Sequence, residues 1–205
     1  MVIRFLRGYF LINFCNDPAI GFVSHLLGDG PSWSWTLTTQ LGELLNEAET
    51  RYGKRDLEYT ILGLDIGGYR PKIWYTGTHK QVFVRLSLEA KCDFGQAYFQ
   101  LAHEVVHLLC PNGGGGTIVL EEGLAHLFST EMSDTNGTHY NASIPAYDRA
   151  ADLLRPLLSS NPDFIRDVRQ IEPCMAKITP EHLISVFPSG DKTVFNALCE
   201  PFQDS

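Results

Sequence analysis

The chain has 205 residues, of which 44% are hydrophobic and 20% charged, a balance typical of a globular protein with a substantial core. Its formal net charge of -8 argues against nucleic acid and anionic membranes as partners. No apolar run approaches the roughly 20 residues of a membrane-spanning helix, so membrane insertion is not expected.

The first residues of the chain and its cysteines indicate the cellular compartment in which the protein is expected. Residues 1–14 make a poor signal peptide, because their apolar stretch is short and no small-residue cleavage site follows. The five cysteines are odd in number and include no CxxC pair, so they provide no disulfide framework. A reducing, cytoplasmic location is therefore expected.

The first half of the chain predicts one helix and several strands. Over 37–52, apolar residues recur at helical spacing, and Gly53 provides a stop signal. Three short β-rich runs follow at 59–64, 72–76 and 81–86, separated by glycines.

The next expected helix, 94–110, carries the most informative motif, HEVVH, and Asp93 is its candidate N-cap. His103 and His107 are four residues apart and so lie on one face of the helix, where both imidazoles can bind one metal ion. Glu104 can then act as general base toward a water that the metal activates. The alternative is a pair of surface histidines on an ordinary amphipathic helix.

A third ligand is expected from a second helix over 117–132. Glu122 points away from the apolar side of this helix, whereas Glu121 sits near the edge of that side. A catalytic zinc usually takes three protein ligands plus water, so Glu122 is the preferred third ligand and Glu121 the second choice. His126, one turn beyond Glu122, could orient a ligand, contact substrate, replace a ligand or simply bond to backbone.

HEVVH followed fifteen residues later by Glu122, within the run EEGLA, resembles the gluzincin group of metallopeptidases. The resemblance covers about thirty residues and implies that His103, His107 and Glu122 bind one Zn²⁺, with Glu104 as catalytic base. Two features depart from the group. The exopeptidase motif Gly-Ala-Met-Glu-Asn is absent, and His126 stands where thermolysin-type members have an aspartate that holds a zinc-binding imidazole.

The resemblance also implies an α+β, zincin-like fold, in which a small antiparallel sheet lobe and a helical C-terminal lobe flank the metal site. In that fold an edge strand can pair with an extended peptide, and 81–86 is the candidate here. A purely structural strand at 81–86 is the equally good alternative. We expect one domain over 1–205, with an N-terminal helix and sheet lobe (1–92), a zinc-binding helix pair (93–133) and a helical lobe (134–205).

The helical lobe is expected to follow a polar loop at 134–143. Its helices are predicted over 145–158, kinked or broken near Pro156, and then over 162–170 and 180–187.

Gluzincins usually add a Tyr or His from this lobe to stabilise the oxyanion that forms when water attacks a carbonyl. The candidates are His139, Tyr140 and Tyr147, with His126 a further possibility. Tyr147 is preferred, although its position beside Ala150 and Leu154 suits a core tyrosine slightly better.

These patterns together predict a zinc-dependent peptidase that hydrolyses peptide bonds in a peptide or protein substrate. One alternative is a non-proteolytic regulatory or interaction protein with a zincin fold and a structural metal. A metal-free interaction module with an accidental HEVVH motif is the other.

Overall fold

The structure is a computed structural model that describes residues 24–26, 33–77 and 80–203. Its elements, in order, are the strands β1 (Ser24–Leu26) and β2 (Trp33–Thr36), the helix α1 (Leu37–Tyr52), the strands β3 (Thr60–Ile66), β4 (Lys72–Tyr75) and β5 (Gln81–Leu86), and the helices α2 (Phe94–His107), α3 (Val119–Thr135), α4 (Pro145–Ser160), α5 (Phe164–Ile171), α6 (Pro180–Val186) and α7 (Lys192–Leu198). Short 3-10 helices, η2 (Leu88–Cys92) and η3 (Met175–Lys177), precede α2 and α6.

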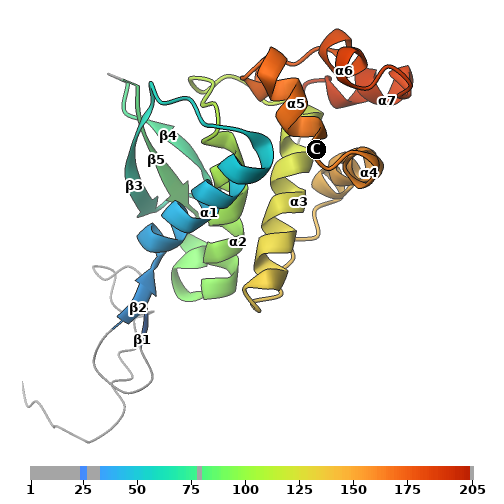
Figure 1. The fold of residues 1–205 in the computed structure, drawn as a ribbon. Coiled ribbons are helices and arrows are strands. Elements are labelled where there is room, and N and C mark those ends of the chain that lie inside the picture. The colour runs from blue at the N-terminus through green and yellow to red at the C-terminus, as the bar shows by residue number, and fades with distance from the viewer. Residues whose placement is uncertain (1–23, 27–32, 78–79, 204–205) are drawn as a thin grey trace, which may run out of the picture.

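The described chain is an α+β protein in which α2 and α3 lie side by side at the centre (Figure 1). The three-stranded sheet lies on one side of this pair, and α4 to α7 lie on the other. One cluster of buried apolar side chains runs through α1, β5 and helices α2 to α7. The two central helices therefore hold the sheet and the C-terminal helices around a common core.

Several predicted elements are confirmed. The helix over 37–52 has the expected bounds, and the strand over 81–86 is β5. Helix α2 starts as expected, and the carboxylate of Asp93 accepts a hydrogen bond from the backbone N–H of Gln96 at 2.9 Å. The signal-peptide prediction concerns residues 1–14, which lie outside the described residues.

The sheet differs from the prediction in two ways. The strand order is β3-β5-β4, with β5 antiparallel to β4 but parallel to β3, so the sheet is mixed rather than antiparallel. Strand β5, expected at the edge, is central, and β3 and β4 form the edges of this sheet. Burial explains the order, because Val82, Val84 and Leu86 of β5 are fully buried whereas β3 and β4 are only partly covered.

A buried pair of hydrogen bonds fixes the sheet to α2. The side-chain amide of Gln100 donates to the Ser87 hydroxyl at 2.8 Å, and its carbonyl oxygen accepts from the Ser87 backbone N–H at 2.9 Å. Both polar groups are thus satisfied away from water. This contact sets the end of β5 against the helix that carries HEVVH.

Helix α4 is not broken near Pro156, so that part of the prediction is wrong. Helix α4 continues through Pro156 to Ser160, although the proline removes one backbone N–H from the helix. Ala150, Ala151 and Leu154 bury one side of α4 in the core. We attribute the continuity to this packing, because tertiary contacts contribute more to the stability of a protein helix than local propensity does.

The sequence patterns gave no signal for α7 or for the 3-10 helices. Helix α7 has only seven residues, which leaves little apolar periodicity to detect, and it lacks the initial proline that marks the start of the equally short α6. Asp191 caps it by accepting a hydrogen bond from the Thr193 backbone N–H at 2.7 Å.

Gly123 lets α3 and α4 approach closely. A Cβ atom at Gly123 would lie 2.6 Å from the backbone oxygen of Ala150 in α4. No larger residue fits without moving α4. This helix carries Asp148, whose side chain contacts His126, and Tyr147, whose ring lies near those of His103 and His126.

Replacing Gly123 by alanine is therefore expected to lower the free energy of unfolding by about 1–3 kcal/mol, because the methyl group forces α4 outward. Urea denaturation measures the change. Gly42 in α1 is the matched control, since a Cβ there meets nothing within 4 Å. Gly42→Ala should raise stability by up to about 1 kcal/mol, and a gain of the same kind at Gly123 would contradict the close approach.

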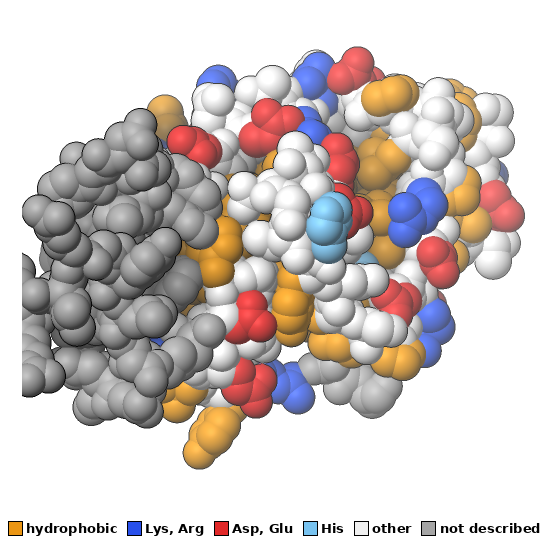
Figure 2. Space-filling model, turned by 90° about the horizontal axis from the view of Figure 1, so that it is seen from below, with side chains coloured by type: hydrophobic (Ala, Val, Ile, Leu, Met, Phe, Trp, Pro, Cys, Tyr) orange, Lys and Arg blue, Asp and Glu red, His pale blue; other side chains and the backbone are white. Residues whose placement is uncertain are grey.

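The surface mixes charges of both signs. On the face in Figure 2, Asp and Glu side chains are spread out, with Lys and Arg side chains between them. Among the described helices, none combines the length and apolarity that a bilayer crossing requires.

Candidate metal centre

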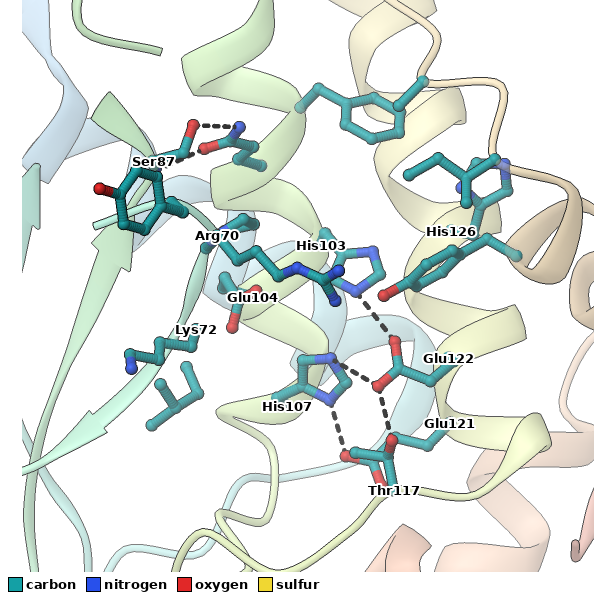
Figure 3. Close-up of a pocket in the computed structure, with 18 of the residues that line it drawn as sticks. Arg70, Lys72, Ser87, His103, Glu104, His107, Thr117, Glu121, Glu122 and His126 are labelled. Carbon is teal, nitrogen blue, oxygen red and sulfur yellow. Dashed lines mark hydrogen bonds and ion pairs between the residues drawn. The ribbon is translucent and has the colours of Figure 1, made fainter. Parts of the chain in front are cut away.

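His103, His107 and Glu122 come together where α2 and α3 lie side by side. Nε2 of His103 is 3.1 Å from Oε2 of Glu122, and Nε2 of His107 is 3.7 Å from Oε1 of the same carboxylate. One ligand atom from each residue lies within 4.8 Å of the other two. This group could hold a metal ion (Figure 3).

The local folding of the chain explains this convergence. The two histidines are one helical turn apart on α2, and Glu122 lies in the first turn of α3. The Thr117 hydroxyl donates to Oε1 of Glu122 at 2.7 Å and so fixes the carboxylate. Burial alone would raise the pKa of Glu122, but the adjacent His107 and His103 outweigh it and lower that pKa to about 2.

Glu121 contacts the other side of the His107 ring. Its Oε1 atom lies 2.8 Å from Nδ1 of His107, an arrangement in which Nδ1–H donates and Nε2 faces Glu122. Burial alone would lower the pKa of His107, but Glu122 and Glu121 outweigh it and raise that pKa to about 10. Sequence reasoning weighed Glu121 only as an alternative ligand. The available signal was the pair of consecutive carboxylates, which project about 100° apart on a helix and can flank one ring.

Glu121 is only 3% exposed, and its Oε2 atom has no hydrogen-bond partner among the described residues. We expect Glu121→Gln to weaken metal binding by about 10–100-fold, because the amide is a poorer acceptor for Nδ1–H and leaves the ring less basic. Competition with a chelating dye measures the affinity. Glu131→Gln, an exposed position on the same helix, is the control, and equal affinities in the two variants would contradict this role.

Glu104 lies beside the three candidate ligands but outside the group that they form (Figure 3). It is only 4% exposed, and burial raises the pKa of its carboxyl group, with His107 and His103 acting in the opposite direction. A buried carboxyl group with a raised pKa holds a proton more readily, which suits a group that accepts a proton and later returns it.

A cleft of about 680 Å³ runs past these side chains. Lys72, Ile73 and Tyr75 of the edge strand β4 line one wall, and Tyr140 and Tyr147 line another part of it. In Figure 3 the Arg70 side chain, just before β4, reaches across toward His103 and Glu104, and Lys72 lies farther along the strand. The candidate metal centre thus lies between the sheet and the helices that follow α3.

The candidate oxyanion donors differ in placement. The Tyr147 ring lies 5.5 Å from the His103 ring, measured between centroids, and Tyr147 lines the cleft. Tyr140 also lines the cleft, with its ring 5.4 Å from that of Phe99. His139 does not line it; its exposed side chain lies 3.2 Å from Asp134.

His126 bonds to a side chain and not to backbone. Its Nε2 atom lies 3.1 Å from Oδ1 of Asp148 on α4, and its ring lies edge-on to that of Phe99 and tilted against that of Tyr147. Burial lowers the pKa of His126, partly opposed by Asp148. His126 therefore joins α3 to the start of α4. In thermolysin-type gluzincins an aspartate at this position holds a zinc-binding imidazole; here the carboxylate of Glu121 contacts the His107 ring instead.

The fold and the site thus define an α+β protein with a His–His–Glu candidate metal centre beside an open cleft. No protein-family model matches the chain, and comparison with curated proteins and with solved structures finds no match either.

Proposed function

We propose that this chain is a zincin-like, zinc-dependent peptidase that hydrolyses peptide bonds. The observation that carries the proposal is the group of His103, His107 and Glu122 beside the buried carboxyl group of Glu104, all on the wall of one cleft. The first three supply metal ligands and the fourth a proton acceptor, which are the parts that metal-assisted hydrolysis requires.

The donor set fits zinc. Two imidazole nitrogens and one carboxylate oxygen form one of the usual three-ligand sets of catalytic zinc sites. Structural zinc sites are closed by four protein ligands, whereas three ligands beside a cleft of about 680 Å³ leave room for substrate. When bound, zinc would polarise the scissile carbonyl and acidify water. These features favour a catalytic over a structural metal.

The chain's own residues then divide the remaining work. Glu104 takes a proton from the attacking water and later delivers it to the leaving amine, a dual role suited to a carboxyl group whose pKa burial raises. Tyr147 is the preferred donor to the oxyanion, supported by its position in the cleft near His103.

The substrate class that fits is an extended peptide segment. Strand β4 pairs with β5 on one side only within the described sheet, and three of its residues line the cleft. An edge strand can bind a peptide through backbone hydrogen bonds without requiring a particular sequence. The described cysteines Cys110, Cys174 and Cys199 are free, which supports a reducing, cytoplasmic location.

Elemental analysis of the purified protein tests the metal, and cleavage of an unstructured protein such as casein tests the activity. We expect about one zinc per chain and cleavage that a hydroxamate inhibits. Glu122→Ala should lose most of the zinc, because one of three ligands is gone, whereas Glu131→Ala should retain it. Normal zinc content in Glu122→Ala would contradict the ligand assignment, and a zinc-loaded protein that cleaves nothing would favour the structural-metal alternative.

A further inference from the structure

Two cysteines that are distant in the sequence meet behind the metal-binding helix. Cys110 lies three residues beyond the end of α2, and Cys174 directly precedes η3. The Sγ atom of Cys174 lies 3.9 Å from the backbone oxygen of Cys110. This contact brings the Cys174 sulfur to the residue that carries the other thiol, which a bridge between them requires.

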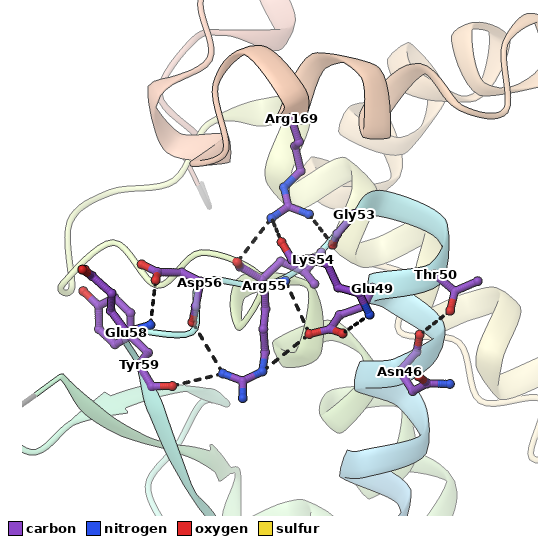
Figure 4. Close-up of polar contacts among 11 residues, drawn as sticks. Asn46, Glu49, Thr50, Gly53, Lys54, Arg55, Asp56, Glu58, Tyr59 and Arg169 are labelled. Atoms are coloured by element: carbon purple, nitrogen blue, oxygen red, sulfur yellow. Dashed lines mark hydrogen bonds and ion pairs between the residues drawn. The ribbon is translucent and has the colours of Figure 1, made fainter.

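The guanidinium group of Arg169 on α5 binds the backbone next to each of the two cysteines. Its Nη2 atom donates to the Leu109 carbonyl at 3.3 Å, and its Nε atom donates to the Pro173 carbonyl at 3.1 Å. Leu109 and Pro173 immediately precede the two cysteines. The same group also binds the end of α1, as Figure 4 shows for Gly53 and Lys54. One buried cation therefore holds both cysteine-bearing segments in place.

The surroundings of Cys174 favour its thiolate. The hydrogen bond from the Cys110 thiol lowers the pKa of Cys174, burial opposes this, and the backbone of Ala176 and the charge of Lys177 also lower it. The same thiol–thiol bond raises the pKa of Cys110. Cys199 contrasts with Cys174, because burial raises the pKa of its thiol to about 11. Cys174 is thus the more nucleophilic sulfur.

Both sulfur-bearing residues border a second, open cleft. It has a volume of about 480 Å³, and Lys80 and Lys177 are among the residues that line it. Cys174 is 7% exposed, so a small oxidant reaches this position more easily than a protein thiol does.

We propose that Cys110 and Cys174 form a hydroperoxide-sensitive thiol pair that closes reversibly to a disulfide. The Cys174 thiolate attacks a peroxide oxygen, giving a sulfenic acid and hydroxide as the O–O bond breaks. The Cys110 thiol then attacks the Cys174 sulfur, forming the S–S bond and releasing water. The peroxide is reduced and the two thiols are oxidised by two electrons in all. The bridge would join the end of the metal-binding helix to the segment between α5 and η3.

The test uses the full reduced chain, with and without added zinc. Hydrogen peroxide is added at equimolar concentration, free thiols are trapped with N-ethylmaleimide, and peptides are identified by mass spectrometry. We expect a peptide that joins Cys110 to Cys174, lost after dithiothreitol, and formed equally in Cys199→Ser. In Cys110→Ser, Cys174 should instead accumulate as a sulfenic acid that dimedone traps.

The pair is refuted if peroxide takes Cys174 to the sulfinic acid with no link in the unmodified chain, or joins it to a different cysteine. This readout comes from the unmodified sequence, so it holds even where a variant folds poorly. It also measures thiols and not hydrolysis. A negative result here leaves the proposed peptidase standing, and an inactive but linked protein leaves the thiol pair standing.

Discussion

Replacing Glu104 by glutamine is expected to lower kcat/KM for peptide hydrolysis by about 10²–10⁴-fold while zinc remains bound. Glutamine keeps the size of the side chain and one carbonyl oxygen but cannot accept the proton of the attacking water. Because Glu104 is not one of the three ligand residues, the metal centre should persist. Zinc content and cleavage rate measured on the same preparation test both halves of this expectation.

The control for this substitution is Glu89→Gln, an exposed carboxylate on the wall of the same cleft. Its activity should stay close to that of the unmodified chain. Activity retained by Glu104→Gln would mean that another group takes the proton. If Glu104→Gln loses zinc as well as activity, then Glu104 supports the metal centre and is not a base alone.

The second large effect concerns the fold. Arg169→Met is expected to lower the free energy of unfolding by about 3–5 kcal/mol. Arg169 is 6% exposed and donates five hydrogen bonds, all to backbone carbonyl groups. Methionine fills much of the same space but leaves these buried acceptors without a donor, and each unsatisfied acceptor is costly.

Urea denaturation compares this variant with Arg155→Met on α4. Arg155 is largely exposed and forms a single 3.9 Å ion pair with Asp152, so its loss should cost less than about 1 kcal/mol. Equal losses at the two positions would mean that the Arg169 hydrogen bonds contribute little net stability. A loss confined to Arg169 supports its role in joining α1, α2 and α5.

Local patterns predicted the elements that carry the candidate site. The bounds of α1 and β5 and the cap at Asp93 follow from periodicity and capping, which depend on neighbours within about one helical turn. The choice of Glu122 over Glu121 follows from the side of the helix that it faces, and its meeting with both histidines is expected because a zinc site needs a third protein ligand. The identity of a metal and of a reaction does not follow from geometry of this kind and is proposed here on the chemistry of the donors.

Features that depend on distant segments could not be read from the sequence. The parallel pairing of β3 with β5 places strands side by side that β4 separates along the chain. Arg169 contacts carbonyl groups that lie more than a hundred residues away, and Cys174 meets Cys110 across 64 residues. Pairing between such segments is decided by packing of the whole core, which no window of neighbouring residues encodes.

The position of His107 between two carboxylates has a thermodynamic consequence for metal uptake. Burial would lower the pKa of the ring, but Glu122 and Glu121 outweigh it and raise that pKa to about 10, which favours the protonated ring at neutral pH. A ligand nitrogen must be deprotonated to coordinate, so the proposed binding of a metal ion would release that proton to solvent. The proposed uptake would therefore exchange one cation for another, with metal affinity rising as the medium becomes alkaline and falling as it becomes acidic.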